Sequence, residues 1–327
     1  MSLLPARHSR HLAEAGGSCH RHDDGGILPP VATRGEFELT SNFGIEDLAK
    51  INMKNSVTAE SIRPPAVAGR FYPGDPDKLR RMVDSFMGSA KISVRGKSKA
   101  VIAPHAGYAY SGPIAASAFV HFAGERDTIK RIILLGPSHR FAFEGIALSH
   151  AEAFATPRGT VPVDKAAVNR IETFPAVCFE ERAHLHEHSL EVELPFLQAT
   201  LNDFTVVPLV VGDATDDEVA EVIDQLWGGD ETRFVISSDL SHYYDYESAR
   251  ELDRCTAQNI ERNAGEAITA QHACGYRPIR GFLQAAQRRQ LHAQTVDLRN
   301  SGDTAGPRDQ VVGYGAFVFN ESQPSSG

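Results

Sequence analysis

The sequence has no long apolar run and no block of basic residues. One of its longest apolar stretches, residues 204–211, is the length of a single strand and far too short to span a membrane, and the N-terminus lacks the apolar core of a signal peptide. The net charge is −9, whereas nucleic acids and anionic membranes are bound through clusters of Lys and Arg. We therefore expect a cytoplasmic protein that has neither a nucleic-acid nor a membrane partner.

Cysteine is also scarce. The four cysteines, Cys19, Cys178, Cys255 and Cys274, are scattered, and no two of them have C-x-x-C spacing. This pattern indicates neither a disulfide framework nor a structural zinc cluster. Any cysteine that contributes to function is expected to act singly.

Two regions differ in composition. Residues 1–61 contain Gly-Gly pairs, two adjacent prolines and little apolar periodicity, which predicts a disordered N-terminal extension. Four histidines and Cys19 in this region leave a metal-binding tail as the alternative. In residues 62–321, segments with strand and helix patterns alternate. This predicts one α/β domain with a central mixed, mostly parallel sheet and helices on both faces.

Three strand-like segments each end in a histidine or an aspartate. In an open α/β sheet, ligands bind outside the carboxyl ends of the strands, so these side chains should meet in one crevice. The segments are residues 100–104 followed by His105, residues 132–135 followed by His139, and residues 233–236 followed by Asp239 and His242.

Cap and turn signals predict several of the connecting elements. Asp75 before Pro76 should begin a helix, as should Ser111 before Pro113, and Thr215 with Glu218 forms a capping box. A hairpin is expected from residues 145–150 and 160–163, and a helix at 190–197. His188 precedes this helix and should share one of its faces with Glu191. The remaining expected elements are helices at 246–263, 266–273 and 278–289 and a closing strand at 311–319.

The residue types at the strand ends favour a metal or acid–base site. Imidazoles with one anionic ligand and open positions suit non-haem iron, copper or catalytic zinc. Cys274 could supply the anion as a thiolate, but a lone cysteine is more often a small buried apolar residue. On the residues alone, the anionic ligand stays open.

A series of motifs resembles the Memo family, named in bacteria as protein B of the AmmeMemoRadiSam system. The resemblance covers roughly residues 63–320 in one order. Its motifs are AVAGRFYP, APHAGYAYSG, GPSH, ATPRGTVPVD, EHSLEVELPFL, SSDLSHY, ACGYRP and the closing NSGD and VVGYGAFVF.

The resemblance implies a fold similar to that of class III extradiol dioxygenases, which are non-haem iron enzymes. It also implies that His105, His139 and Cys274 are the metal ligands. Four further residues are implied as acid–base or supporting groups of the same pocket, namely His188, Glu191, Asp239 and His242.

A cysteine stands where those dioxygenases have a carboxylate ligand. Thiolate favours softer or redox-cycling metals, so the resemblance to these dioxygenases does not extend to ring cleavage. The resemblance to the family implies Fe(2+) or Cu(+/2+) and a dioxygenase-like oxidoreductase acting on a small molecule or a peptide. An AMMECR-type protein and a radical SAM enzyme are possible partners by association of names. The alternatives are a non-catalytic binding or signalling module, and a zinc hydrolase with Asp239 or Glu191 as its base.

Overall fold

The computed structural model describes residues 62–94 and 96–321. The predicted disordered extension, residues 1–61, lies outside these ranges. The described strands are β1 (Ile62–Arg63), β2 (Ser98–Ala103), β3 (Arg131–Pro137), β4 (Ile146–Leu148), β5 (Ala153–Thr156), β6 (Gly159–Pro162), β7 (Val177–Phe179), β8 (Thr205–Val211), β9 (Thr232–Ser237), β10 (His242–Tyr244), β11 (Leu291–Asn300) and β12 (Val311–Glu321).

The described helices are α2 (Pro76–Ser89), α3 (Tyr108–Phe119), α4 (Lys165–Val168), α5 (Glu181–Leu185), α6 (Leu194–Thr200), α7 (Asp216–Gln225), α8 (Tyr246–Glu261) and α9 (Tyr276–Arg288). Four short 3₁₀ turns accompany them, namely η1 (Val120–Glu125), η2 (Glu191–Glu193), η3 (Gly265–Ala267) and η4 (Ser301–Asp303). None of the described helices is both long enough and apolar enough to cross a membrane.

A nine-stranded mixed sheet forms the centre of the fold. Its path is β10-β12-β2-β9-β3-β8-β4-β7, with β11 paired to β12. The four strands β2, β9, β3 and β8 are parallel neighbours, and antiparallel pairs flank them. All six residues of β2 and of β9 are buried, as expected for strands covered on both faces. The predicted single α/β domain with a mixed sheet is confirmed.

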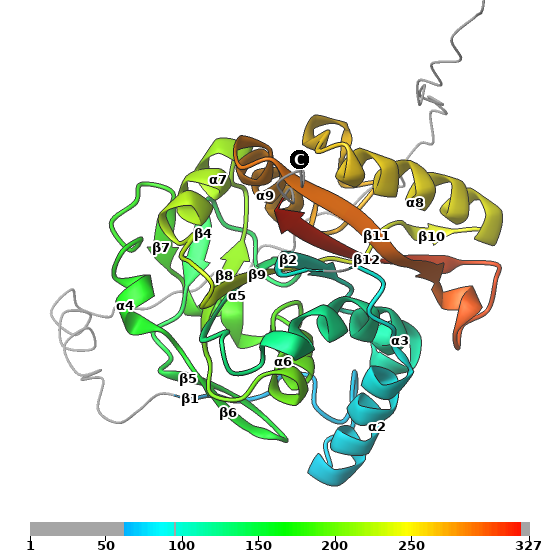
Figure 1. Ribbon diagram of the computed structural model, residues 1–327, viewed down its shortest axis with the longest axis horizontal. Coiled ribbons are helices and arrows are strands. Elements are labelled where there is room, and N and C mark those ends of the chain that lie inside the picture. Colours follow the sequence, from blue (N-terminus) through cyan, green and yellow to red (C-terminus); the bar gives the residue numbers. More distant parts are fainter. Residues whose placement is uncertain (1–61, 95, 322–327) are drawn as a thin grey trace, which may run out of the picture. The chain divides into compact units, whose positions relative to one another are not determined.

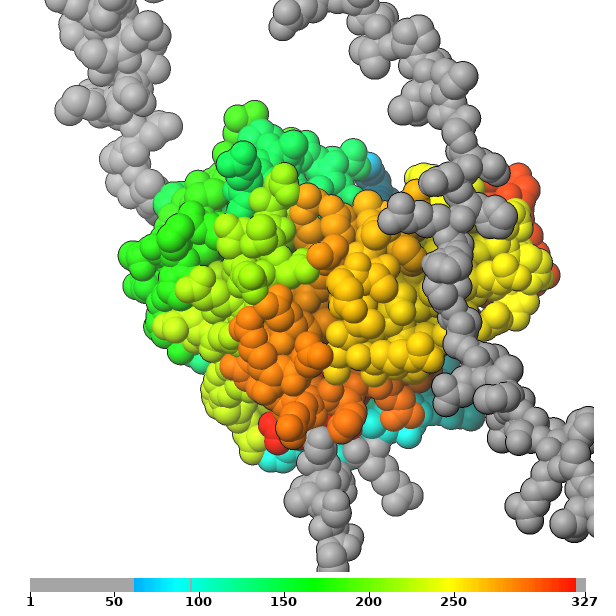
Figure 2. All heavy atoms as spheres, turned by 90° about the horizontal axis from the view of Figure 1, so that it is seen from above, coloured from blue at the N-terminus to red at the C-terminus, as the bar shows by residue number. Residues whose placement is uncertain are grey.

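Helices cover both faces of this sheet (Figure 1). Helices α2, α3 and α6 pack together on one side, and α7, α8 and α9 lie on the other. Figure 2 looks onto this second layer, where the yellow-to-orange part of the chain, which includes α8 and α9, forms much of the visible face. The carboxyl ends of β2, β3 and β9 therefore open at one edge of a sheet covered on both sides.

Two predicted helix starts are confirmed by their cap geometry. The Asp75 side chain accepts the Lys78 N–H at the start of α2, with Pro76 at the first helical position. Thr215 and Glu218 form the reciprocal capping box of α7. A third predicted start is wrong, because α3 begins at Tyr108 and Pro113 lies inside it.

The predicted hairpin has a different first strand. β5, not residues 145–150, pairs with β6, because the turn at residues 156–159 joins the two strands directly and pairs Thr156 with Gly159. Residues 146–148 instead form β4, which extends the main sheet between β8 and β7.

One further expectation is wrong in the C-terminal third, and one strand there was not predicted. Residues 266–273 form only the short turn η3 followed by a loop, and this loop leads to Cys274. β11 was not predicted, because its alternation of polar and apolar residues is weak and its side chains are only partly buried. It pairs along nearly the whole of β12.

Candidate metal centre

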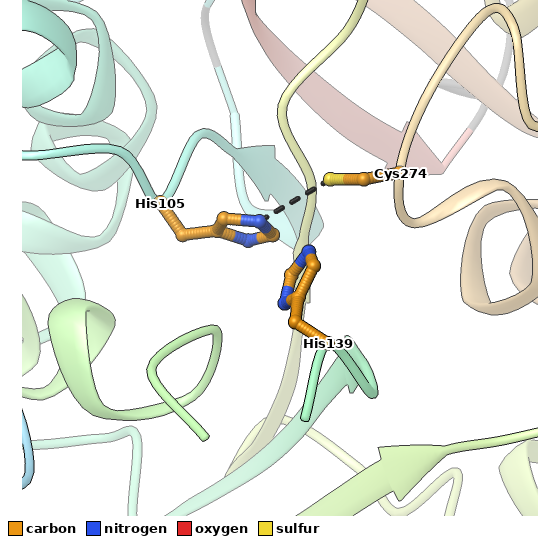
Figure 3. A group of neighbouring side chains, drawn as sticks. All are labelled: His105, His139 and Cys274. Carbon is orange, nitrogen blue, oxygen red and sulfur yellow. Dashed lines mark hydrogen bonds between the residues drawn. The ribbon is translucent and has the colours of Figure 1, made fainter. Parts of the chain in front are cut away.

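The three predicted strand ends do converge. β2, β9 and β3 are adjacent and parallel, so His105, Asp239 and His139 leave the sheet at the same edge. Cys274 reaches this edge from the loop between η3 and α9. Figure 3 shows the His105 and His139 rings turned toward the Cys274 sulfur. The three residues come from three separate segments of the chain.

The donor atoms lie close enough together to share one ion. Cys274 Sγ lies 3.2 Å from His105 Nε2. One ligand atom each from His105, His139 and Cys274 fall within 4.8 Å of one another. A metal with bonds of roughly 2.0–2.3 Å to nitrogen and sulfur requires donors at about this mutual separation.

His105 is almost fully buried, with 1% of its surface exposed. Its Nδ1 lies 2.7 Å from Ser237 Oγ, and its backbone N–H donates to Asp239 Oδ1 at 2.8 Å. Burial, followed by the charges of His139 and other nearby imidazoles, holds the pKa of His105 well below its usual range. His105 is therefore a neutral imidazole, which is the form that binds metals.

His139 is oriented by a residue that the sequence analysis did not select, Glu187. The Glu187 carboxylate accepts the His139 backbone N–H at 2.5 Å and lies 2.9 Å from His139 Nδ1. Although burial raises the pKa of Glu187, its hydrogen bonds and the imidazoles of His139 and His188 outweigh that effect and lower it to about 2. With Nδ1 bonded to a carboxylate, the Nε2 atom of His139 is left for a metal.

The loop that carries Cys274 is fixed against β9. The Gly275 N–H donates to Ser238 Oγ at 2.9 Å, and the Cys274 N–H donates to the Asp239 carbonyl at 3.3 Å. A Cβ at Gly275 would lie 2.6 Å from the Ser238 Cβ, so only glycine permits this approach. Burial, and then the charge of Asp239, raises the pKa of the Cys274 thiol when no metal is bound. A bound cation opposes this effect, because coordination removes the proton.

A cavity of about 520 Å³ opens over these residues. Asp239 is 5% exposed, and burial raises the pKa of its carboxyl against the opposing charge of His242. Tyr243, which is 72% exposed, has a positive φ of 63° next to His242. The lining residues are His105, His139, Arg140, His188, Asp239, His242, Tyr243, Tyr244, Ala270, Gln271 and Cys274.

Glu191 is the sequence-selected residue that lies outside this cavity. Its two oxygens accept four hydrogen bonds, from the Arg63 guanidinium, the Tyr72 hydroxyl and the backbone N–H groups of Ala66 and Val67. The expectation that His188 and Glu191 share a helix face is wrong, because His188 precedes η2 and lines the cavity whereas Glu191 binds the segment at residues 63–72. A carboxylate with four donors is a structural anchor and has no free oxygen to act as a base.

His139, Glu187 and His188 form a second group with the spacing of a metal site. Glu187 Oε1 already accepts the backbone N–H groups of His188 and Ser189, each at 2.8 Å, besides its contact with His139. We therefore interpret Glu187 as the residue that orients His139. Glu187 is the first residue of the motif EHSLEVE. The spacing of this motif does not indicate which of its carboxylates contacts a histidine of the site.

The comparison with known families identifies the family of this chain. Residues 63–318 match the family model described as Memo-like protein. The chain belongs to the Memo family.

Similar Memo proteins come from bacteria and archaea. The chain is 35% identical over 270 residues to a "MEMO1 family protein" of Aquifex aeolicus, an alignment that covers 79% of this chain and 99% of that protein. It is 34% identical over 286 residues to a "MEMO1 family protein" of Sulfolobus acidocaldarius, covering 80% and 100%. The matched Memo region contains every residue of the cavity.

Proposed function

We propose that this chain is a metal-dependent redox protein that holds iron or copper between His105, His139 and Cys274. The supporting observation is that Nδ1 of each imidazole faces a hydrogen-bond partner, Ser237 Oγ for one and Glu187 for the other. Both Nε2 atoms are then left as donors beside the Cys274 sulfur. Second groups that fix the orientation of ligating histidines are typical of metal sites.

The donor set suits a redox metal. Two imidazoles and one thiolate combine borderline and soft ligands, which suit copper and iron as well as zinc. Bound iron or copper would supply one-electron redox chemistry. A zinc hydrolase with Asp239 as its base is the alternative, because Glu191 has no free oxygen for that role.

The chain's own residues would bind the substrate and move protons. His242 Nδ1 lies 2.8 Å from the Leu240 carbonyl, which can only accept, so Nδ1 carries the proton and Nε2 can accept one from a substrate. Asp239 lines the same cavity. The volume of about 520 Å³ suits a small molecule or one side chain of a peptide. We therefore propose His242 as the acid–base group, with Asp239 as its support.

Metal identification tests this proposal. The chain, purified without chelators, is assayed for iron, copper and zinc, and the apoprotein is titrated anaerobically with Fe(II) and Cu(I). We expect stoichiometric binding of one redox metal and reversible oxidation of the bound ion. Retention of zinc alone, with no tight binding of iron or copper, would overturn the redox proposal and favour the hydrolase. Unchanged binding of a partner by the His105→Ala and His139→Ala variants would favour the binding-module alternative.

A further inference from the structure

The Ser237 hydroxyl, at the end of β9, lies between three buried groups. Its Oγ is 2.7 Å from His105 Nδ1, 2.6 Å from the Ser189 carbonyl oxygen and 2.7 Å from Glu193 Oε1. All three distances are those of hydrogen bonds. The hydroxyl has one proton and two lone pairs, so it can donate once and accept twice.

Counting protons assigns each of these bonds. The Ser189 carbonyl can only accept, so it takes the single Ser237 proton. His105 must then donate from Nδ1–H to Ser237 Oγ. The remaining short contact, between Ser237 Oγ and Glu193 Oε1, contains a proton only if Glu193 supplies it. An ionised Glu193 would compete for the Ser237 proton and leave the Ser189 carbonyl against an oxygen with no hydrogen between them.

The surroundings of Glu193 fit a neutral acid. Glu193 is 0% exposed, and within the described part of the chain its Oε2 has no hydrogen-bond partner. Burial raises the pKa of Glu193 well above its usual range against the hydrogen bond to Ser237. Glu191, two residues earlier and equally buried, contrasts with it, because Arg63 and three further donors surround the Glu191 carboxylate.

We propose that Glu193 is a buried neutral carboxylic acid that donates to the Ser237 hydroxyl, and that this hydroxyl, whose own proton goes to the Ser189 carbonyl, holds His105 in the Nδ1–H tautomer. The Nε2 lone pair then points toward Cys274, and metal binding requires no tautomer change at His105. Ser237 is a positioning residue, since it has no atom among the metal-ligand atoms. Its role toward the metal rests on the proposed function, whereas the protonation state of Glu193 does not.

Infrared difference spectroscopy of the metal-free protein at neutral pH tests the protonation state. We expect a carboxylic-acid C=O stretch in the wild type that disappears in Glu193→Gln. Glu191→Gln is the matched control and should leave this band in place. Absence of the band at neutral pH, or its persistence in Glu193→Gln, would overturn the proposal.

The tautomer of His105 is read from the ¹⁵N shifts and couplings of its imidazole in the metal-free protein. We expect Nδ1–H in the wild type and in Glu193→Gln, because the glutamine amide can replace the acid as the donor to Ser237 and the Ser189 carbonyl still takes the Ser237 proton. Ser237→Ala removes the hydroxyl that accepts from Nδ1–H, so a population of Nε2–H should appear. An unchanged tautomer in Ser237→Ala would show that Ser237 does not position His105.

Metal titration separates this inference from the proposed function. Glu193→Gln should bind Fe(II) or Cu(I) as the wild type does, and Ser237→Ala should bind about 10–100-fold more weakly, as is typical when a group supporting a metal ligand is lost. Failure of every variant, and of the wild type, to bind metal would defeat the proposed function while the infrared and tautomer results still decide the state of Glu193. Equal affinity of Ser237→Ala and the wild type would overturn the positioning role.

Discussion

Cys274 Sγ lies 3.2 Å from His105 Nε2 although 169 residues separate the two in the chain. A thiol and an imidazole nitrogen at this distance form a hydrogen bond in the metal-free protein. A bound metal would replace the shared proton, because the thiolate and the neutral imidazole are the ligating forms. Metal binding at this pair should therefore release a proton from Cys274.

Replacing Cys274 by serine should weaken Fe(II) or Cu(I) binding by more than about 100-fold, which exceeds the usual loss for a merely supporting group. Anaerobic titration measures this effect, and metal should also protect Cys274 from alkylation. Cys178→Ser is the control, since Cys178 is exposed on β7 far along the sheet from the site. Wild-type affinity in Cys274→Ser would exclude the thiolate as a ligand and leave Asp239 as the candidate anion.

His242→Ala should spare the metal. His242 lines the cavity but is not among the three residues whose ligand atoms cluster. We expect metal content near that of the wild type, together with loss of any turnover that depends on proton transfer. His139→Ala is the comparison and should lose the metal. Equal loss in the two variants would make His242 a ligand.

Glu187→Gln should disturb both the fold and the metal centre. The carboxylate accepts N–H groups from His139, His188 and Ser189, and a glutamine amide would set its own N–H groups against some of these donors. Metal affinity should fall about 10–100-fold, and thermal denaturation should show a lower Tm. Unchanged affinity would mean that Glu187 does not orient His139.

Arg63→Met should destabilise the protein by about 3–5 kcal/mol, because it leaves the buried Glu191 carboxylate without its cation. Arg63 also donates to the carbonyls of His184 and Glu187, which adds to the loss. Urea unfolding of both single variants and of Arg63→Met/Glu191→Gln measures the coupling of the pair. Additive effects in the double variant would show that the ion pair contributes nothing.

A truncated chain that begins at Met53 should keep the melting temperature and metal content of the full chain. Arg63, which binds Glu191 and the carbonyls of His184 and Glu187, is retained in this truncated chain together with these partners. A large fall in melting temperature would show that the removed residues stabilise the domain.

Asp253→Asn should stabilise the metal-free protein above pH 6. Burial raises the pKa of Asp253 to about 6 against a hydrogen bond from the Ser241 N–H. The folded state therefore holds a proton that the unfolded chain releases near pH 4, so the contribution of Asp253 to stability is full below pH 4 and is lost as the pH rises through 6. A shift of about two units corresponds to about 3 kcal/mol.

Urea unfolding at pH 4 and pH 8 checks the Asp253 prediction. The difference in unfolding free energy between Asp253→Asn and the wild type should increase between these two pH values. If the difference in unfolding free energy is the same at pH 4 and pH 8, Asp253 does not ionise between these pH values in the folded protein and the prediction is wrong.

The sequence by itself determined the strand ends and the family. Apolar runs that stop at Gly-Pro or at a polar cluster predicted β2, β3 and β9, and parallel strands present their carboxyl ends at one edge, so His105, His139 and Asp239 could be grouped without coordinates. The cap residues Asp75 and Thr215 were also readable, because a cap depends on neighbours within three or four residues.

Only the tertiary structure decided which carboxylates serve the site. Glu187, Glu191 and Glu193 lie within one short segment, yet their partners differ. Glu187 orients His139, Glu191 binds Arg63, and Glu193 contacts Ser237 with no cation beside it among the residues that the structure describes. Their separate roles follow from a turn of 3₁₀ helix and from partners more than 40 residues away. The hydrogen-bond donors around a buried carboxylate come from distant parts of the chain, so the residues next to the carboxylate in the sequence do not predict them.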